Sequence, residues 1–264
     1  MNSDSPRDDE LTTDLARALA ADEFYLVYQP EIDLHTNGFA GVEALLRWRH
    51  PQRGVINAAD FLSLLESSGD IIVVGAWILT TACRQGADWH AKGYRFPVAV
   101  NASLTQLRDA RFADTVMRSV EESRLDPSRL TIEFSHVACA DPEILAHLVE
   151  LRAQGVQLAI DDFSPGHPDF DELRRLPVDI IKLDRRFVAA TADEDDPQIH
   201  RLVQDARTLH LRVIASGVED ALQRDHLRLE QVDVGQGYHF ARPFEAHEID
   251  HFLEDFALFS GRPL

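Results

Sequence analysis

Acidic, amide and basic side chains stand at the ends of several short apolar segments of this chain, and they are the residues best suited to chemistry. Glu133 lies in LTIEFSH, Asp161 and Asp162 end the run VQLAIDDF, and Lys182 lies in DIIKLD. Carboxylate and amide oxygens are the ligands that Mg²⁺ and Mn²⁺ prefer. The full set, in chain order, is Glu43, Arg47, Asn101, Glu133, His136, Asp161, Asp162, Lys182, Ser216, Glu219 and Gln236.

The adjacent carboxylates of Asp161 and Asp162 indicate a particular kind of site. Neighbouring acids can each hold one of two metal ions, an arrangement that activates water and stabilises the leaving oxygen in phosphodiester cleavage. Arg47 and Lys182 would complement the negative charge of a phosphate. A single acid at a strand end more often caps a helix or forms a loop salt bridge. The hypothesis therefore depends on whether the whole set converges.

The hydrophobic pattern predicts the elements that would position this set. A helix over 10–21 leads into an antiparallel hairpin of strands 24–34 and 39–48, with a turn at 35–38, and helices follow over 58–68 and 70–92. Pro142 is placed to start a helix and Gly155 to end one. Further strands are expected at 97–103, 130–136, 156–163, 179–184, 212–218 and 232–240, and helices at 110–124, 141–154, 169–175, 197–210, 219–230 and 246–257.

Alternating strands and helices over this length are typical of parallel strands joined by crossover helices. Eight strands with about as many helices favour a closed barrel over an open sheet, and the C-terminal strand ends of such a barrel meet at one mouth. The polar residues end their strands, so we expect them to line that mouth. We divide the chain into residues 1–9, expected to be disordered, a lead-in helix over 10–23, the barrel over 24–257 and a tail over 258–264.

The composition argues against several classes of protein. A net charge of −19 is unfavourable for nonspecific nucleic-acid binding, so an anionic ligand would need a local cation or a metal. No apolar run is long enough to span a bilayer, and the acidic start MNSDSPRDDE is not a signal peptide. Two cysteines, Cys83 and Cys139, are too few for a disulfide framework, and the expected location is a reducing cytoplasm.

Seven segments carry a resemblance to a known family. In order they are YQPEIDL, EALLRWRHP, VAVNAS, AIDDF, LPVDIIKLD, SGVED and QGYHFARP. They resemble the motifs of the EAL domain family, bacterial phosphodiesterases and receptors of cyclic di-GMP, over residues 24–253. The resemblance implies an α/β fold, a TIM-like (β/α)8 barrel with an antiparallel first strand. It also implies a metal-dependent opening of cyclic di-GMP to linear pGpG.

The resemblance also implies roles for individual residues. The family's metal ligands correspond to Glu43, Asn101, Glu133 and Asp161, with Asp162 serving a second metal, and its catalytic lysine corresponds to Lys182. Arg47 corresponds to a residue that contacts a ligand phosphate. The implied ligand-binding residues are Gln29, Leu45, Arg47, Asp161, Glu219, Gln236 and Tyr238.

Three departures from the family pattern concern the same region. Ser216 stands where the family motif AEGVE has its catalytic glutamate, and His136 replaces a glutamate that anchors a neighbouring loop. That loop, DDFGTGYSS in the family, reads DDFSPGHPDF here, with Ser164, Pro165 and Pro168 at altered positions. Proline fixes φ and removes a backbone donor, so this loop cannot simply repeat the family's turn. We expect the second metal site to be lost, with one divalent cation (Mg²⁺, Mn²⁺ or Ca²⁺) still able to bind.

The departures favour a degenerate EAL domain that binds cyclic di-GMP with little or no hydrolysis. Two alternatives stay open: a working phosphodiesterase that produces pGpG, and an interaction module that has lost the ligand. The helix before YQP resembles the connector after a GGDEF domain, so GGDEF or other signalling domains in a longer chain are candidate partners. A homodimer is a further alternative.

Overall fold

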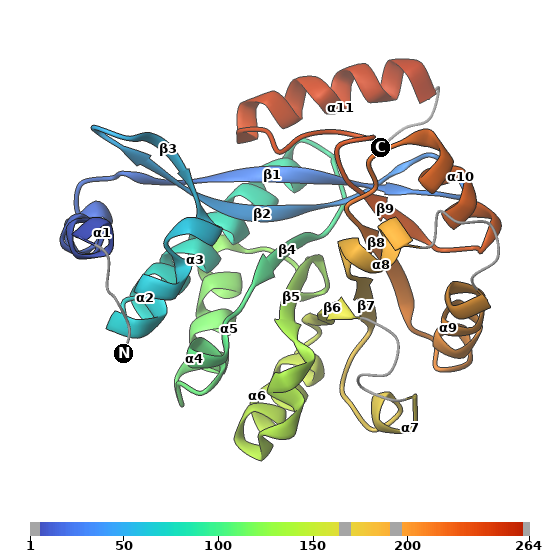
Figure 1. The fold of residues 1–264 in the computed structure, drawn as a ribbon, viewed down its shortest axis with the longest axis horizontal. Coiled ribbons are helices and arrows are strands. Elements are labelled where there is room, and N and C mark those ends of the chain that lie inside the picture. The colour runs from blue at the N-terminus through green and yellow to red at the C-terminus, as the bar shows by residue number, and fades with distance from the viewer. Residues whose placement is uncertain (1–5, 164–169, 191–196, 261–264) are drawn as a thin grey trace.

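The computed structural model describes residues 6–163, 170–190 and 197–260, and within them eight strands close into a barrel (Figure 1). The order around the ring is β1, β9, β8, β7, β6, β5, β4 and β2, and β1 also pairs with β2. Strand β1 is antiparallel to both of its neighbours, whereas β2 and β4 to β9 run parallel. The strands are β1 (Phe24–Asp33), β2 (Phe39–His50), β4 (Val98–Asn101), β5 (Leu130–Ser135), β6 (Gln157–Phe163), β7 (Ile180–Leu183), β8 (Arg212–Ser216) and β9 (Val234–Gln236).

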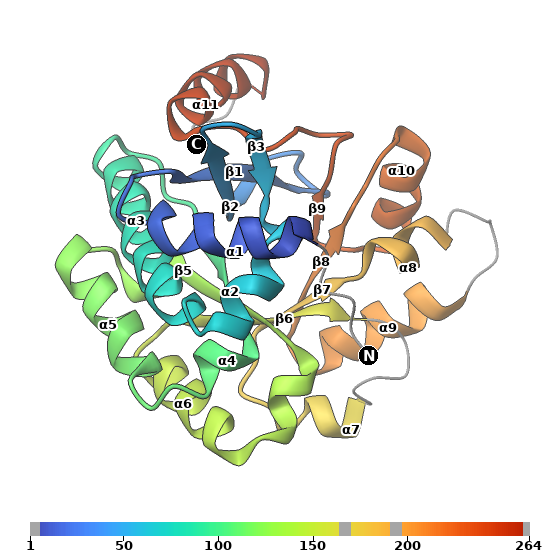
Figure 2. The same ribbon diagram turned by 60° about the vertical axis from the view of Figure 1, so that its left-hand side comes forward.

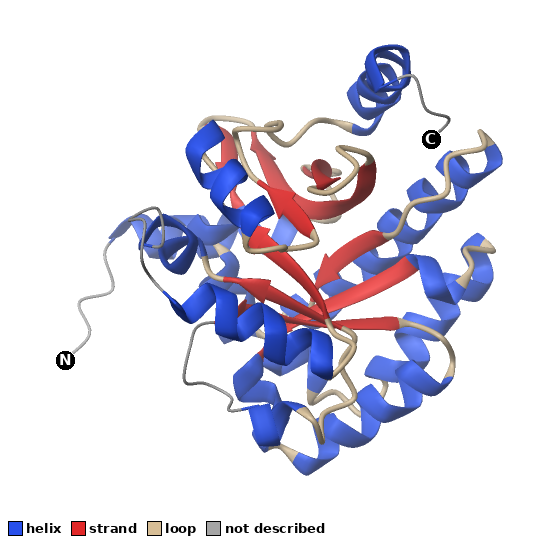
Figure 3. Ribbon diagram, turned by 90° about the vertical axis from the view of Figure 1, so that its right-hand side faces the viewer, coloured by secondary structure: helices blue, strands red, loops and turns tan. Residues whose placement is uncertain are grey.

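Helices surround the strands on the outside of the barrel (Figure 3). The sequence-based prediction of a TIM-like barrel with an antiparallel first strand is thus confirmed. Helix α11 contacts β1, on the side of the barrel where the first strand runs against the others (Figures 1 and 2). The helices are α1 (Pro6–Ala18), α2 (Leu62–Ser68), α3 (Ile71–Ala91), α4 (Leu104–Leu107), α5 (Phe112–Ser123), α6 (Pro142–Ala153), α7 (Phe170–Leu173), α8 (Arg185–Ala190), α9 (Pro197–Thr208), α10 (Ala221–Leu229) and α11 (Ala246–Ser260).

Local sequence accounts for most element boundaries. Pro142 begins α6 with Asp141 as its cap, and Gly155 follows the helix at φ +95°, a left-handed conformation that glycine adopts without strain. The turn between β1 and β2 is fixed by Asp33, whose Oδ1 accepts hydrogen bonds from the backbone N–H groups of His35 and Thr36.

The structure differs from the prediction where elements are short. Strand β3 (Gly54–Asn57), which pairs with β2, was not expected, because its four mostly exposed residues show no apolar alternation. Helices α4 and α8 were also missed, and each is under two turns long. The strand expected over 232–240 is confined to Val234–Gln236, because the chain turns at Gly237. Helix α1 begins at Pro6, whereas the sequence pattern predicts a helix from residue 10.

Alternate residues of β6 to β9 point into the barrel and form two layers. Ala159, Ile180, Ile214 and Val234 pack against one another as an apolar layer. Side chains two residues apart share a face of a strand, so the next inward positions lie directly above this layer. Those positions are Asp161, Lys182, Ser216 and Gln236. The barrel is therefore closed by apolar side chains below a polar layer that faces the mouth.

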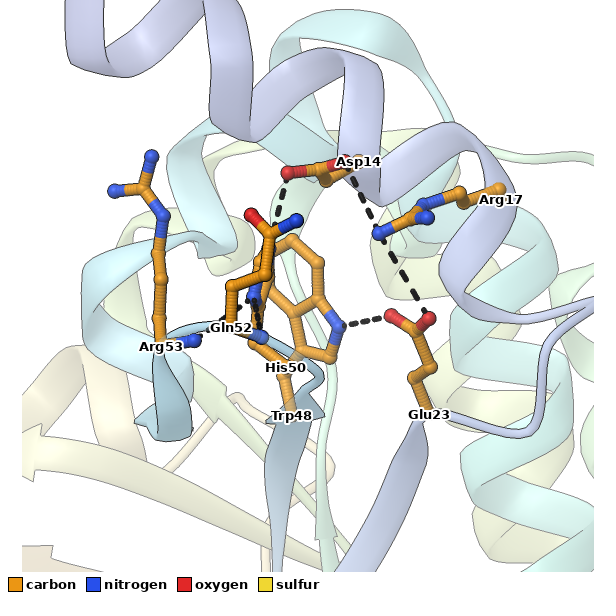
Figure 4. Close-up of polar contacts among 7 residues, drawn as sticks. All are labelled: Asp14, Arg17, Glu23, Trp48, His50, Gln52 and Arg53. Atoms are coloured by element: carbon orange, nitrogen blue, oxygen red, sulfur yellow. Dashed lines mark hydrogen bonds and ion pairs between the residues drawn. The ribbon is translucent and has the colours of Figure 1, made fainter.

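Helix α1 is attached to the end of β2 by a polar network around the buried side chain of His50 (Figure 4). The side chain of His50 is 0% exposed, and its Nε2 lies 3.0 Å from Oδ2 of Asp14 on α1. Its Nδ1 accepts the backbone N–H groups of Gln52 and Arg53 at 3.1 and 3.2 Å. Because Nδ1 is the acceptor, the ring proton must be on Nε2, and the Nε2–H group donates a hydrogen bond to Asp14. Nearby, Trp48 Nε1 donates to Glu23 at 2.9 Å.

Replacing His50 with alanine is expected to lower the free energy of unfolding by about 1–3 kcal/mol, because the buried imidazole and its hydrogen bonds to Asp14 and to the backbone N–H groups of Gln52 and Arg53 are lost together. Arg17→Ala is the matched control, since Arg17 also binds Asp14, at 3.1 Å, but is 51% exposed and its ion pair contributes at most about 1 kcal/mol. Denaturant unfolding measures the free energy, and hydrogen exchange in α1 reports the local attachment. Equal losses in the two variants would contradict a special role for His50.

Candidate functional site

The ammonium group of Lys182 is the centre of the polar layer. Lys182 is 1% exposed, and its Nζ lies 2.9 Å from Oε2 of Glu43 and 2.6 Å from Oε2 of Glu133. Strand β7 brings the lysine to this point, while β2 and β5 bring the two carboxylates from other parts of the ring. A buried cation held by two carboxylates neutralises charge that would otherwise be costly to bury.

Neutral amides complete the surroundings of Glu43. Gln236 Nε2 donates to Oε2 at 2.8 Å, and Asn101 Nδ2 donates to Oε1 at 2.6 Å. Together with Lys182, these donors occupy both carboxylate oxygens. Glu133 is different, because its Oε1 is buried and has no hydrogen-bond partner among the described residues. The same holds for Oε1 of Glu31, a buried acid on β1.

Burial and Lys182 shift the pKa values of these groups in opposite directions. Burial raises the pKa of Glu133 well above its ordinary value, and it also raises the pKa of Asp161 and Glu31. Burial acts on Glu43 too, but Lys182 and the three hydrogen bonds outweigh it and hold the pKa of Glu43 below its ordinary value. Burial alone would lower the pKa of Lys182, yet the surrounding carboxylates raise it well above its ordinary value. The surrounding carboxylates therefore favour the charged ammonium form of Lys182.

A cavity of about 270 Å³ opens above this layer, and we call it the mouth cavity. Asp162 reaches it from a β-bulge of β6, where its φ is +54°. Ser216 ends β8 beneath the cavity, and its Oγ is buried without a hydrogen-bond partner among the described residues. The lining residues are Gln29, Glu43, Asp161, Asp162, Lys182, Arg185, Ser216, Gly217, Glu219, Gln236, Gly237 and Tyr238.

A second cavity of about 370 Å³ adjoins the first and shares Asp161 and Asp162 with it. Its lining is mostly apolar and includes Leu45, with Asn101 and Glu133 on the side of the polar layer. The two cavities thus bring together most residues that the sequence singled out. Their shared acids join a polar compartment to an apolar one.

Arg47 and His136 line neither of these two cavities. Arg47 is half-buried on β2, its Nη1 donates to the carbonyl oxygen of Leu46 at 2.8 Å, and burial lowers its pKa. His136 is half-buried at the start of a short 3₁₀ turn after β5. Ser164, Pro165 and Pro168 lie outside the described residues. The roles expected for all five residues stay predictions.

Sequence reasoning missed two residues of this region. Arg185 lines the mouth cavity, and Glu31 is buried inside the barrel. Arg185 follows the strand end IIKLD directly, which is the position where the other functional residues were sought. Glu31 lies two residues after Gln29 on β1, so strand alternation could have placed it on the inward face.

The donor set suits a hard cation in chemistry, although it is not a ready-made metal site. In the described part of the chain no three His, Cys, Asp or Glu side chains converge in a metal-binding arrangement. Nζ of Lys182 instead lies between the carboxylates of Glu43 and Glu133. Oε1 of Glu133 is nevertheless a buried ligand oxygen with no hydrogen-bond partner in the part of the chain that the structure describes, and Asp161 and the amide oxygen of Asn101 are further candidate ligands.

Comparison with known proteins agrees with this geometry. The model of the EAL domain family matches residues 12–243. The bifunctional diguanylate cyclase/cyclic di-GMP phosphodiesterase MucR of Pseudomonas aeruginosa is 37% identical over 254 residues, which are 94% of this chain and 37% of MucR. The cyclic di-GMP phosphodiesterase PdeR of Escherichia coli is 34% identical, over 89% of this chain and 36% of PdeR. The chain thus spans little more than a third of the length of these relatives.

Solved structures show the same relationship. The PaMucR phosphodiesterase in complex with c-di-GMP has a TM-score of 0.86 and 35% identity, covering 91% of this chain and 99% of that chain. The EAL enzyme Bd1971, in a form bound to cAMP and cyclic-di-GMP, has a TM-score of 0.86 and 26% identity over 93% of this chain and 69% of that chain. No helix among the described residues is long and apolar enough to cross a membrane. The chain belongs to the EAL domain family.

Proposed function

We propose that this chain is a cyclic di-GMP receptor domain with little or no hydrolysis. The observation that carries the proposal is Ser216. It lines the mouth cavity at the position of the family's catalytic glutamate, and its buried hydroxyl has no hydrogen-bond partner among residues 6–163, 170–190 and 197–260. The rest of the ring is kept, since Lys182 still joins Glu43 to Glu133 and Gln236 still donates to Glu43. Losing one catalytic carboxylate costs roughly 10²–10⁴-fold in rate while leaving a binding surface largely intact.

The two cavities offer complementary groups to a cyclic dinucleotide. Leu45 and its apolar neighbours suit a base, and the polar mouth suits the sugar-phosphate ring. Tyr238 is 57% exposed at the rim, where its ring can stack on a base while the guanidinium of Arg242 lies 4.3 Å from its centre. The proposed ligand-binding residues are Gln29, Leu45, Arg47, Asp161, Glu219, Gln236 and Tyr238.

We propose at most one divalent cation, held by Glu43, Asn101, Glu133 and Asp161. Members of this family generally depend on a divalent metal. Such an ion supplies Lewis-acid polarisation of a phosphoryl oxygen. Asp162 can offer one carboxylate toward a second ion, but Ser216 cannot supply the other. A neutral hydroxyl at that position leaves the second ion short of the negative charge that holds it.

The test is a calorimetric titration with cyclic di-GMP, with and without Mg²⁺, together with chromatographic detection of pGpG in Mg²⁺ and in Mn²⁺. The proposal predicts binding without significant product. Turnover at about 1 per second or faster, within the ordinary range of enzymes, would establish the phosphodiesterase alternative instead. Absence of binding would favour an interaction module.

Replacing Arg47 with alanine is expected to weaken cyclic di-GMP binding by about 1–3 kcal/mol, the range for a charge-assisted hydrogen bond to a phosphate. The matched control is Arg49→Ala, because Arg49 lies two residues along β2 but is bound to Glu245 at 3.0 Å and packs over the Tyr25 ring. Titration calorimetry measures both affinities. An unchanged affinity in the Arg47 variant would remove this residue from the site.

The domain limits and the wider setting also stay proposals. We propose that residues 24–257 form the ligand-binding barrel and that α1 connects it to GGDEF or other signalling domains of a longer chain. A cytoplasmic location and a homodimer remain sequence-based predictions.

A further inference from the structure

Carboxylates outnumber basic side chains in the lining of the mouth cavity, and the basic side chains differ in how far a ligand can reach them. Its lining includes four carboxylates, those of Glu43, Asp161, Asp162 and Glu219, and two basic side chains, Lys182 and Arg185. The ammonium of Lys182 is buried and already bound by two carboxylates. Among the described residues that line this cavity, Arg185 is therefore the cation that a ligand can reach, and its side chain is 69% exposed.

The backbone at Gly217 determines where Arg185 lies. Gly217 has a φ of +74°, and a Cβ at this residue would come within 2.3 Å of Cγ and 2.7 Å of Cβ of Arg185. The aliphatic part of Arg185 therefore packs directly on the Gly217 backbone, next to Ser216. Any other residue at 217 would combine a strained φ with a clash, so glycine is needed for this packing.

The guanidinium of Arg185 is held in place by Glu219. The Nη2 atom of Arg185 forms an ion pair with Oε1 of Glu219, across the turn that follows β8. The backbone N–H of Glu219 donates to Oε1 of Gln223 at 2.7 Å, and this hydrogen bond holds the Glu219 backbone in place just before α10. Ser216 adds no carboxylate beside Arg185, whereas a glutamate at 216 would compete with Glu219 for it.

We propose that Arg185 is the phosphate-binding cation of the mouth and that the ligand takes it from Glu219. This rests on the proposed function, in which the ligand is cyclic di-GMP. A guanidinium presents paired N–H donors that match two oxygens of a phosphate. Breaking an exposed ion pair such as Arg185–Glu219 costs little free energy, so a phosphate can replace the carboxylate. Arg185 thus provides positive charge without a metal ion. This charge lies beside the second metal site, which the proposed function takes to be weakened by Ser216.

The experiment compares affinities for cyclic di-GMP in EDTA, so that no metal can replace the arginine. Arg185→Ala is expected to weaken binding about 10- to 100-fold, the range for a bidentate charge-assisted contact. Arg185→Lys should fall between wild type and Arg185→Ala, because it keeps the charge but loses the paired donors. The control is Arg186→Ala, which removes the same charge from a neighbouring, 91% exposed residue bound to Asp184. Its affinity should stay within about twofold of wild type.

Glu219→Gln tests the exchange itself. Glutamine keeps the shape and hydrogen-bonding groups that Glu219 offers a ligand but removes the charge that competes for Arg185. Binding is therefore expected to tighten about two- to fivefold, the contribution of an exposed ion pair that no longer has to be broken. If Arg185→Ala binds as wild type does, the inference fails while the receptor function stands. If wild type binds only in Mg²⁺, the inference fails while the receptor function stands, and if it binds in neither EDTA nor Mg²⁺, both fail together. Equal weakening by Glu219→Gln and Arg185→Ala would overturn the exchange, because the ligand would then need the intact ion pair.

Discussion

Replacing Lys182 with methionine is expected to lower the free energy of unfolding by about 3–5 kcal/mol in EDTA, the cost of leaving a buried charge without its partner. Methionine keeps the length and the apolar stem of lysine, so the change isolates the ammonium. Without it, the buried carboxylates of Glu43 and Glu133 face each other across the barrel with no cation between them. Denaturant unfolding followed by circular dichroism measures the difference.

The chain offers a matched control for this experiment. Its other lysine, Lys92, binds Asp250 at 2.6 Å on the surface, with its side chain 49% exposed. Lys92→Met should cost at most about 1 kcal/mol, as exposed ion pairs do. A Mg²⁺ or Mn²⁺ ion can take the place of the ammonium, so adding either should recover part of the stability of Lys182→Met. Similar losses in the two variants would show that the buried triad does not stabilise the fold.

Restoring the carboxylate at residue 216 alone is expected to recover little hydrolysis of cyclic di-GMP. Ser216→Glu places the missing group at the end of β8, but catalysis requires reacting groups within a fraction of an ångström of productive geometry. His136 still stands where the family has its loop anchor, and residues 164–169 still carry Ser164, Pro165 and Pro168. The new carboxylate would also lie beside Arg185, which competes for it.

The informative variant combines Ser216→Glu, His136→Glu and the family sequence GTGYSS at 164–169. Its production of pGpG should exceed that of Ser216→Glu by at least about tenfold, or roughly 1.4 kcal/mol of barrier. The same combination with Ser216→Gln is the control, since glutamine has the length of glutamate without its charge. Chromatography in Mg²⁺ and in Mn²⁺ measures the product. If Ser216→Glu alone matched the combination, the loop would be irrelevant and the serine would be the whole defect.

The class of fold and the positions that face the mouth are encoded in local sequence patterns. Alternating apolar strands and amphipathic helices are local patterns. Within each strand, the two-residue spacing of side chains indicates which residues face inward. That is why Glu133, Asp161, Lys182 and Gln236 could be assigned to one mouth before any contact was known. The departure at Ser216 is equally local, since it is visible within SGVED.

Contacts between these residues, in contrast, depend on how the strands are arranged in three dimensions. Lys182 and Glu43 are 139 residues apart, and their contact depends on the closure of the ring through β1 and β2 and on the register of each strand. The docking of His50 on Asp14 and the ion pair of Arg185 with Glu219 likewise join different elements. Hydrophobic periodicity carries no information on such pairings, because it specifies which face of an element is buried and not what lies opposite that face.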